Sequence, residues 1–271
     1  MLELVDTHCH IQSIGLGRGE RSTRELWAKA PDLTADSVVE HAVLAGVTHL
    51  ICVGCDLEDS RLAIDFAKDR DACLASIGIH PHEAQHYRGD DAQKAVFAAL
   101  ATEKKVVAVG ECGLDYFYEH SPREAQVEIL KFQIELALKH ELPMIFHVRE
   151  AFSDFWPIFD SYQGVRGVLH SFTDNAENLA KALERGLFIG VNGIVTFAKN
   201  PAQIDVYKSI PLQKLLLETD APFLTPTPYR GTINESKRVG TIAEFMAGLR
   251  DEDLEHVAAT TTANARTLFD I

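Results

Sequence analysis

The segment 105–111 reads KVVAVGE, an almost unbroken apolar run, rich in valine, that ends in a carboxylate. A strand covered on both faces shows such continuous apolar character instead of polar alternation. Similar β-rich runs recur along the chain at 2–6, 47–54, 73–80, 143–147, 165–170, 187–192 and 214–220. The sequence therefore predicts eight buried strands of a parallel sheet.

Segments with helical periodicity separate these runs. In 121–140 we expect Ser121 as the N-cap, Pro122 at the first helical position and Glu124 completing a capping box. The other signals for helix starts and ends are Ser37-x-x-Glu40, Asp174-x-x-Glu177, Gly46 and Gly186. Strands and helices thus alternate.

Eight strands alternating with helices predict an α/β fold. The number eight favours a (β/α)8 TIM barrel, with an open doubly wound sheet as the structural alternative. Because no internal repeat or Gly/Ser linker divides the chain, we expect one domain over 1–271, closed by helices at about 235–249 and 251–268. The long segment 11–33 is expected to form a flap over the site.

Composition limits the function classes. The 271 residues carry a net charge of −14, which argues against a broad basic surface for nucleic acid. This net charge is still compatible with binding the end of a nucleic-acid strand locally, through metal ions and a few arginines. No apolar stretch reaches the ~20 residues of a membrane span, no export signal is evident, and five scattered cysteines suit a reducing compartment. We therefore expect a cytoplasmic monomer that does not enter a membrane, with Cys52-x-x-Cys55 buried.

Candidate metal ligands follow the strands. His8 and His10 are two residues apart, so in a strand both side chains point to one side while Cys9 faces away. Taken alone, this pair could equally be a polar strand end. The other predicted strands, however, end at or near further ligands: His80, Glu111, His147, His170 and Asp220. In a barrel such ends share one rim, and so many histidines and carboxylates suit two transition-metal ions bridged by a carboxylate.

Several motifs extend this pattern over most of the chain: DTHCH (6–10), IGIHPHEA (77–84), VGECGLDYF (109–117), FHVREAF (146–152), LHSFTDN (169–175), VNGIVTF (191–197), LLLETDAPFLTP (215–226), PYRGTINE (228–235) and TTANARTLF (261–269). In this order they resemble the TatD family of metal-dependent hydrolases. The resemblance implies a (β/α)8 barrel that hydrolyses phosphodiester bonds in DNA, typically from a 3′ end. At Ser171 and Ser236 this sequence departs from the residues that the family pattern often has at these positions.

The resemblance also implies a ligand set. His8, His10, Glu111 and Asp220 would hold one divalent ion, and His147 and His170, with Glu111 shared, would hold the other. Zinc, manganese and magnesium are the candidate ions.

We expect a metal-activated water to attack phosphorus in line. Asp220 would orient the water and accept its proton, and His80 would protonate the departing oxygen. Glu111 would be the ligand that both ions share. Arg149 and Arg230 are candidate phosphate contacts. Tyr229 is the best candidate for base stacking, Asn234 is a further substrate contact, and most other aromatic residues beyond the strands are expected to pack.

Two alternatives remain at this point. The same metals could hydrolyse an amide, a lactone, a nucleobase amine or an aminoacyl ester, because one barrel supports many reactions. A non-catalytic metal-binding protein is the other alternative, although Asp220 is intact.

Overall fold

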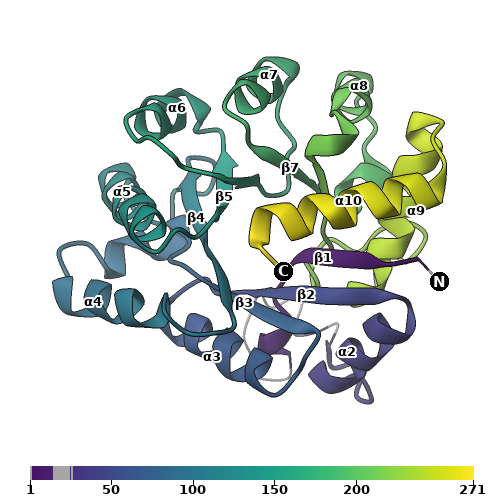
Figure 1. The fold of residues 1–271 in the computed structure, drawn as a ribbon, viewed down its shortest axis with the longest axis horizontal. Helices are drawn as coiled ribbons and strands as arrows, with labels where there is room; N and C mark the ends of the chain where they lie inside the picture. The colour runs from purple at the N-terminus through teal and green to yellow at the C-terminus, as the bar shows by residue number, and fades with distance from the viewer. Residues whose placement is uncertain (1, 15–24, 26) are drawn as a thin grey trace. The chain divides into compact units, whose positions relative to one another are not determined.

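The computed structural model describes residues 2–14, 25 and 27–271. Within them lie eight strands, and Figure 1 labels all of these except β6 and β8: β1 (Leu4–Cys9), β2 (Val47–Val53), β3 (Cys73–Ile77), β4 (Val106–Asp115), β5 (Met144–Arg149), β6 (Gly167–Leu169), β7 (Phe188–Val191) and β8 (Leu215–Leu217). They follow the order β1 to β8 in one sheet. All eight predicted strands and the (β/α)8 fold class are thereby confirmed.

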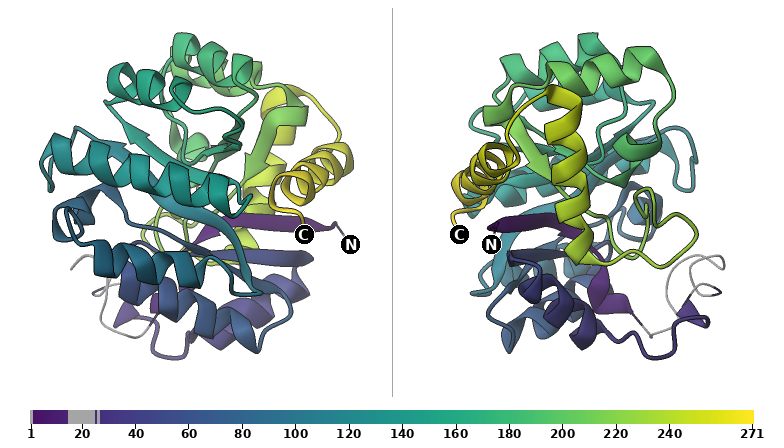
Figure 2. Two further views of the ribbon diagram at one scale, coloured as in Figure 1. Left: turned by 60° about the vertical axis from the view of Figure 1, so that its left-hand side comes forward. Right: turned by 90° about the vertical axis from the view of Figure 1, so that its right-hand side faces the viewer.

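Parallel ladders join β1 to β2, β3 to β4, β4 to β5, β5 to β6 and β7 to β8. The last strand region also meets the first, because Cys9 and Ala221 form a parallel bridge and the His10 amide donates to the Ala221 carbonyl. Figure 2 shows β1 and β2 side by side. The strand ends that carry the candidate ligands are therefore held by backbone ladders.

The chain divides into two compact units. Unit 1 comprises Met1–Cys52 and Ser171–Thr267, and unit 2 comprises Val53–His170 and Leu268–Ile271. The prediction of one domain over 1–271 stays a prediction. Of the predicted flap at 11–33, residues 15–24 and 26 lie outside the described residues, and the flap stays a prediction.

The helices alternate with the strands: α2 (Ala35–Leu44), α3 (Leu57–Lys68), α4 (Asp91–Leu100), α5 (Arg123–Lys139), α6 (Phe152–Asp160), α7 (Ala176–Glu184), α8 (Pro201–Ser209), α9 (Val239–Arg250) and α10 (Leu254–Phe269). In unit 1, α10 lies near the start of β1, where Thr262 donates to the Glu3 carbonyl and Arg266 pairs with the Glu3 carboxylate. Gly46 and Gly186 follow helix ends with φ of 92° and 75°, as predicted.

Three predicted helix starts were wrong. The N-cap of α5 is Pro122, and the Ser121 hydroxyl instead donates to the His82 carbonyl. Thr34, not Ser37, caps α2, because Thr34 and Ser37 exchange hydrogen bonds between side chain and backbone. Asn175, not Asp174, caps α7.

Burial explains why the strands lack polar alternation. Every residue of β1 is buried, and so is every residue of β4 except Val107, which is half-buried. All five cysteines are free, and only Cys55 is partly exposed. No helix among the described residues is long and apolar enough to cross a membrane.

Two glycines allow β4 to run close to β5 within unit 2. Gly110 and Gly113 have φ of 152° and 151°, a region that residues with a Cβ rarely occupy. A Cβ on Gly113 would collide with the carbonyl oxygen of His147. These glycines flank Glu111, so the backbone of β4 is shaped around a candidate ligand.

Candidate metal centre

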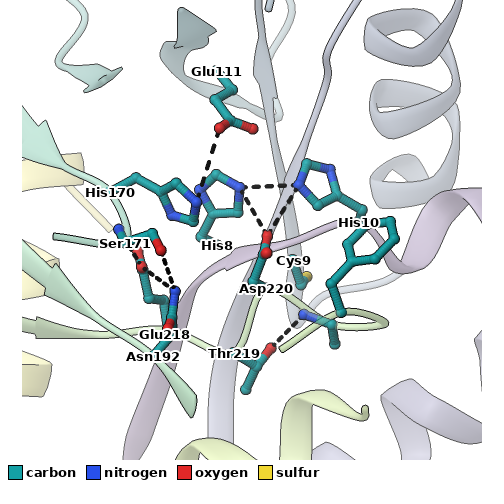
Figure 3. A network of polar contacts seen from close by, with 12 residues as sticks. His8, Cys9, His10, Glu111, His170, Ser171, Asn192, Glu218, Thr219 and Asp220 are labelled. Atoms are coloured by element: carbon teal, nitrogen blue, oxygen red, sulfur yellow. Dashed lines mark hydrogen bonds and ion pairs between the residues drawn. The ribbon is translucent and has the colours of Figure 1, made fainter. Parts of the chain in front are cut away.

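His8, His10 and Asp220 form the unit 1 cluster (Figure 3). His8 Nε2 lies 3.0 Å from His10 Nε2, and the two atoms lie 3.5 and 3.3 Å from Asp220 Oδ1. His8 has no exposed surface, and the Asp220 side chain is only 13% exposed. As predicted, Cys9 faces away, since its thiol contacts the Ile51 carbonyl. Three donor atoms therefore converge in a nearly dry site.

The backbone of unit 1 brings Asp220 to the histidines. The Asp220 amide donates to the His8 carbonyl at 2.8 Å, and Asp220 itself has a φ of 58°. Thr219, one residue earlier, donates from its amide and its hydroxyl to the two carboxylate oxygens of Asp6, at 2.8 and 2.6 Å. Burial raises the pKa of Asp6 to about 7, against the opposing effect of these hydrogen bonds. Asp6 thus fixes the position of the chain just before Asp220.

His80, Glu111, His147 and His170 form the unit 2 cluster. Oε1 of Glu111 lies 2.8 Å from His147 Nδ1, 3.6 Å from His80 Nε2 and 3.9 Å from His170 Nε2. Figure 3 marks the contact between Glu111 and His170. Glu111 and His170 are buried, and the His80 and His147 side chains are 13% and 20% exposed. One carboxylate oxygen therefore faces three imidazoles.

His147 lies between two carboxylates of unit 2. Its Nδ1 contacts Glu111, while its Nε2 lies 3.1 Å from Asp115 Oδ2. Burial opposes the charged imidazolium, but the hydrogen bonds to Asp115 and Glu111 outweigh burial and raise the pKa of His147 to about 9. Without a metal, this histidine is protonated at neutral pH.

The pKa of His80 is shifted in the opposite direction. Burial holds the pKa of His80 well below its usual range, although Glu111 favours the charged form. Its Nδ1 accepts a hydrogen bond from the His82 amide at 3.2 Å. A neutral imidazole that accepts at Nδ1 carries its proton on Nε2, the atom that faces Glu111.

Both donor sets fit divalent cations. Two ligand atoms of a tetrahedral zinc ion lie about 3.3 Å apart, because zinc–nitrogen bonds are about 2.0 Å long. The separations of 3.0, 3.3 and 3.5 Å in the unit 1 cluster match this spacing. In unit 2, His80, Glu111 and His147 each offer one donor atom within 4.8 Å of the others. Imidazole and carboxylate together suit zinc and manganese.

The predicted substrate contacts are divided between the units. In unit 2, Arg149 is exposed, and its guanidinium lies over the rings of Phe117 and Tyr118, 4.1 and 4.8 Å from their centroids. In unit 1, Tyr229 is 44% exposed. Arg230 is also exposed, but it donates to the Thr225 carbonyl and lies over Phe197, 4.1 Å from the centroid.

Asn234 has no exposed surface. Its amide nitrogen donates to the carbonyls of Thr219 and Phe223, on either side of Asp220. These contacts brace the segment that carries Asp220. In place of the predicted substrate contact, we propose that Asn234 positions Asp220.

Sequence reasoning missed Asp115 as a site residue. It is fully buried, and its Oδ2 contacts His147 and also His82, at 2.9 Å. The signal was present, because Glu111 and Asp115 are four residues apart on one strand, and such residues share a face.

Glu218 was also missed. Its Oε1 accepts hydrogen bonds from the Ser171 amide at 2.7 Å and from the Asn192 side chain at 3.3 Å. Asn192 also donates to the Ser171 hydroxyl, so the serine that departs from the family pattern is part of a polar network in unit 1 (Figure 3). Ser236, the other departure, is buried and begins a short 3-10 helix, Ser236–Arg238.

The fold and the clusters are those of a metal-dependent hydrolase, and comparison with known proteins agrees. The family profile of TatD related DNase matches residues 5–270, so the chain belongs to the TatD family. The uncharacterized metal-dependent hydrolase YabD of Bacillus subtilis is 35% identical over 270 residues, covering 99% of each chain. The 3′-5′ ssDNA/RNA exonuclease TatD of Salmonella typhimurium is 35% identical over 246 residues, covering 87% of this chain and 93% of that protein.

The fold has a solved counterpart. The crystal structure of the TatD homologue YjjV from Escherichia coli superposes with a TM-score of 0.85 at 26% identity, covering 99% of this chain and 98% of that one. This chain is accordingly a TatD-family metal-dependent hydrolase.

Proposed function

We propose that this protein is a 3′-5′ exonuclease for single-stranded nucleic acid that uses two divalent ions. The observation that carries the proposal is the pair of donor clusters. In one, donor atoms of His8, His10 and Asp220 lie 3.0 to 3.5 Å apart. In the other, His147 and His170 lie 2.8 and 3.9 Å from one carboxylate oxygen of Glu111. The exonuclease activity named for the Salmonella relative supports the choice of phosphodiester bonds. A cytoplasmic location and a monomeric state stay predictions.

His8, His10 and Asp220 would hold one ion, and His147, His170 and Glu111 would hold the other, with Glu111 shared as the family pattern implies. When bound, the cations would lower the pKa of water and offset charge on the phosphoryl oxygens.

The side chains would handle the protons. Asp220 accepts the proton of the attacking water through its carboxylate. His80 directs its Nε2–H at the departing 3′ oxygen as a hydrogen-bond donor, because its imidazole is neutral with Nδ1 occupied by the His82 amide. The proton that this oxygen finally takes up comes from solvent water, which replaces the predicted proton transfer from His80. Asn234 acts by positioning the Asp220 segment, and Arg149 and Arg230 supply planar donors for phosphate.

The test is metal-dependent trimming of a 5′-fluorescein-labelled single-stranded oligonucleotide, read as a ladder on a denaturing gel. Chelated wild type receives Mg²⁺, Mn²⁺ or Zn²⁺, and Asp220→Asn and Glu111→Gln are run beside it. We expect a ladder with wild type and a loss of about 100-fold or more in both variants. Asp91→Asn, a matched change on a side chain that is 97% exposed, should leave the rate unchanged.

Absence of trimming with every ion, in protein that is folded and metal-loaded, would contradict the proposal. Turnover of amide, lactone or aminoacyl-ester substrates by the same preparation would then identify the alternative reaction.

A further inference from the structure

Two large aromatic side chains project into solvent directly after β4. Phe117 and Tyr118 are 51% and 48% exposed, and their ring centroids lie 4.8 Å apart. Most aromatic residues beyond the strands are expected to pack, but a ring that is half exposed, such as Phe117, contributes little to a core. Its exposure leaves apolar surface available for a ligand.

Arg149 completes this surface, which we call the Phe117 platform (Phe117, Tyr118 and Arg149). Its guanidinium lies over both rings. Within the described part of the chain, no carboxylate pairs with Arg149, so its charge is not neutralised there. A guanidinium held over aromatic rings makes a cation–π contact that uses none of its N–H donors, so these stay available for a phosphate.

Asp115 connects the platform to the unit 2 cluster. Its Oδ1 accepts hydrogen bonds from the amides of Phe117 and Tyr118, both at 3.0 Å, while its Oδ2 contacts His147. The Tyr116 amide also donates to the Arg149 carbonyl at 3.0 Å. The platform and a candidate metal ligand are therefore fixed to one buried carboxylate.

We infer that the Phe117 platform binds one unpaired nucleotide of the substrate, with the base on Phe117 and the neighbouring phosphate on Arg149. This inference rests on the proposed nuclease function and adds its substrate-binding residues. Stacking needs a base that is free of its partner strand and accepts any base, because every base has a π face. The platform thus selects single strands without selecting sequence.

The test combines a protein variant with a substrate variant. Trimming is measured on dT12 and on a set of dT12 oligonucleotides, each with one abasic site at a different distance from the 3′ end. For wild type we expect one position at which the abasic site lowers kcat/KM about tenfold. Phe117→Leu should show the same loss on intact dT12 and no further loss at that position. Phe245→Leu, the matched change at a ring 38% exposed on α9, should behave as wild type.

A binding measurement separates this inference from the proposed function. Anisotropy of 5′-fluorescein-dT12 in chelator should give a Kd about tenfold weaker for Phe117→Leu than for Phe245→Leu. Arg149→Gln should lower the slope of log Kd against log salt by about 0.7, the value for one phosphate contact on a single strand.

If wild type trims dT12 but Phe117→Leu keeps the full abasic sensitivity, the platform inference is overturned and the nuclease stands. If wild type trims nothing, the nuclease proposal fails, and equal Kd values for the two leucine variants would overturn the platform as well.

Discussion

At the scale of single residues, the unit 2 cluster shows how neighbouring groups set opposite protonation states on two histidines. His147 lies between two carboxylates and is held protonated, while His80 is buried with one nitrogen occupied and is held neutral. A metal ligand must give up its proton, whereas a neutral imidazole keeps one N–H as a hydrogen-bond donor. The same few contacts therefore prepare one histidine for exchange with a cation and the other for hydrogen-bond donation.

The pKa of about 9 for His147 predicts that metal binding depends on pH. At pH 7.5 a cation must displace the His147 proton, so binding should release it, and affinity should rise with pH up to about 9. Asp115→Asn removes one of the raising hydrogen bonds, so fewer protons should be released. Calorimetric titration with Mn²⁺ in two buffers of different ionisation enthalpy measures the number, with Asp91→Asn as control. Equal proton release from Asp115→Asn and wild type would contradict this account.

The same group affects the stability of the metal-free protein. The pKa of His147 in the folded protein is raised above the usual value of 6.5. Its contribution to the free energy of unfolding is therefore fully present below pH 6.5 and is lost as the pH rises through about 9. Urea unfolding in chelator from pH 6 to pH 9.5 should show this decline, and Asp115→Asn should flatten it. A stability of Asp115→Asn that falls as steeply as that of wild type would argue against the pair.

At the scale of elements, the strands could be predicted more reliably than the helix starts. A buried strand such as β4 needs only a continuous apolar run, which the sequence displays directly. A helix start depends on which of several capping groups the preceding chain presents. Serine is a residue type that often caps helices, but the Ser121 hydroxyl donates to the His82 carbonyl and accepts from the Gln85 amide. These contacts join segments distant in the sequence, so local sequence patterns do not predict them.

The passage of β4 beside β5 predicts a large penalty for one small substitution. Gly113→Ala places a methyl group against the His147 carbonyl at a φ of 151°, so we expect a loss of about 2–3 kcal/mol in the free energy of unfolding. Gly248→Ala is the matched control, because its Cβ meets nothing within 4 Å and alanine is favoured inside a helix. Urea midpoints measure both variants. Similar midpoints for the two would show that β4 moves away freely.

At the scale of the whole molecule, the candidate ligands divide between the two units. The sequence predicted the candidate ligands because each lies at or near the end of an apolar run, and the order of the strands confirms that those runs are neighbouring strands. It could not predict the distances within each cluster, which depend on register, such as the pairing of Gly113 with His147. The sequence also could not predict the burial of Asn234, whose side-chain amide donates to two backbone carbonyls of unit 1.

This division predicts ion stoichiometry. Equilibrium dialysis with Zn²⁺ should give about two ions per wild-type chain, and about one after His8→Ala with His10→Ala, or after His147→Ala with His170→Ala. Glu177→Gln, at a side chain 75% exposed, serves as the surface control. One ion in wild type, lost completely in either double variant, would exclude two separate sites.

The meeting of the first strand with the chain after the last one also sets an order of assembly during synthesis. Every donor of the unit 2 cluster lies before residue 171, so the ribosome delivers that set before it reaches Asp220. The other set needs Asp220, whose amide hydrogen-bonds the His8 carbonyl, and is complete only when the two distant parts of the chain have joined. A nascent chain that has not reached residue 220 therefore lacks the carboxylate that we propose to accept the water proton.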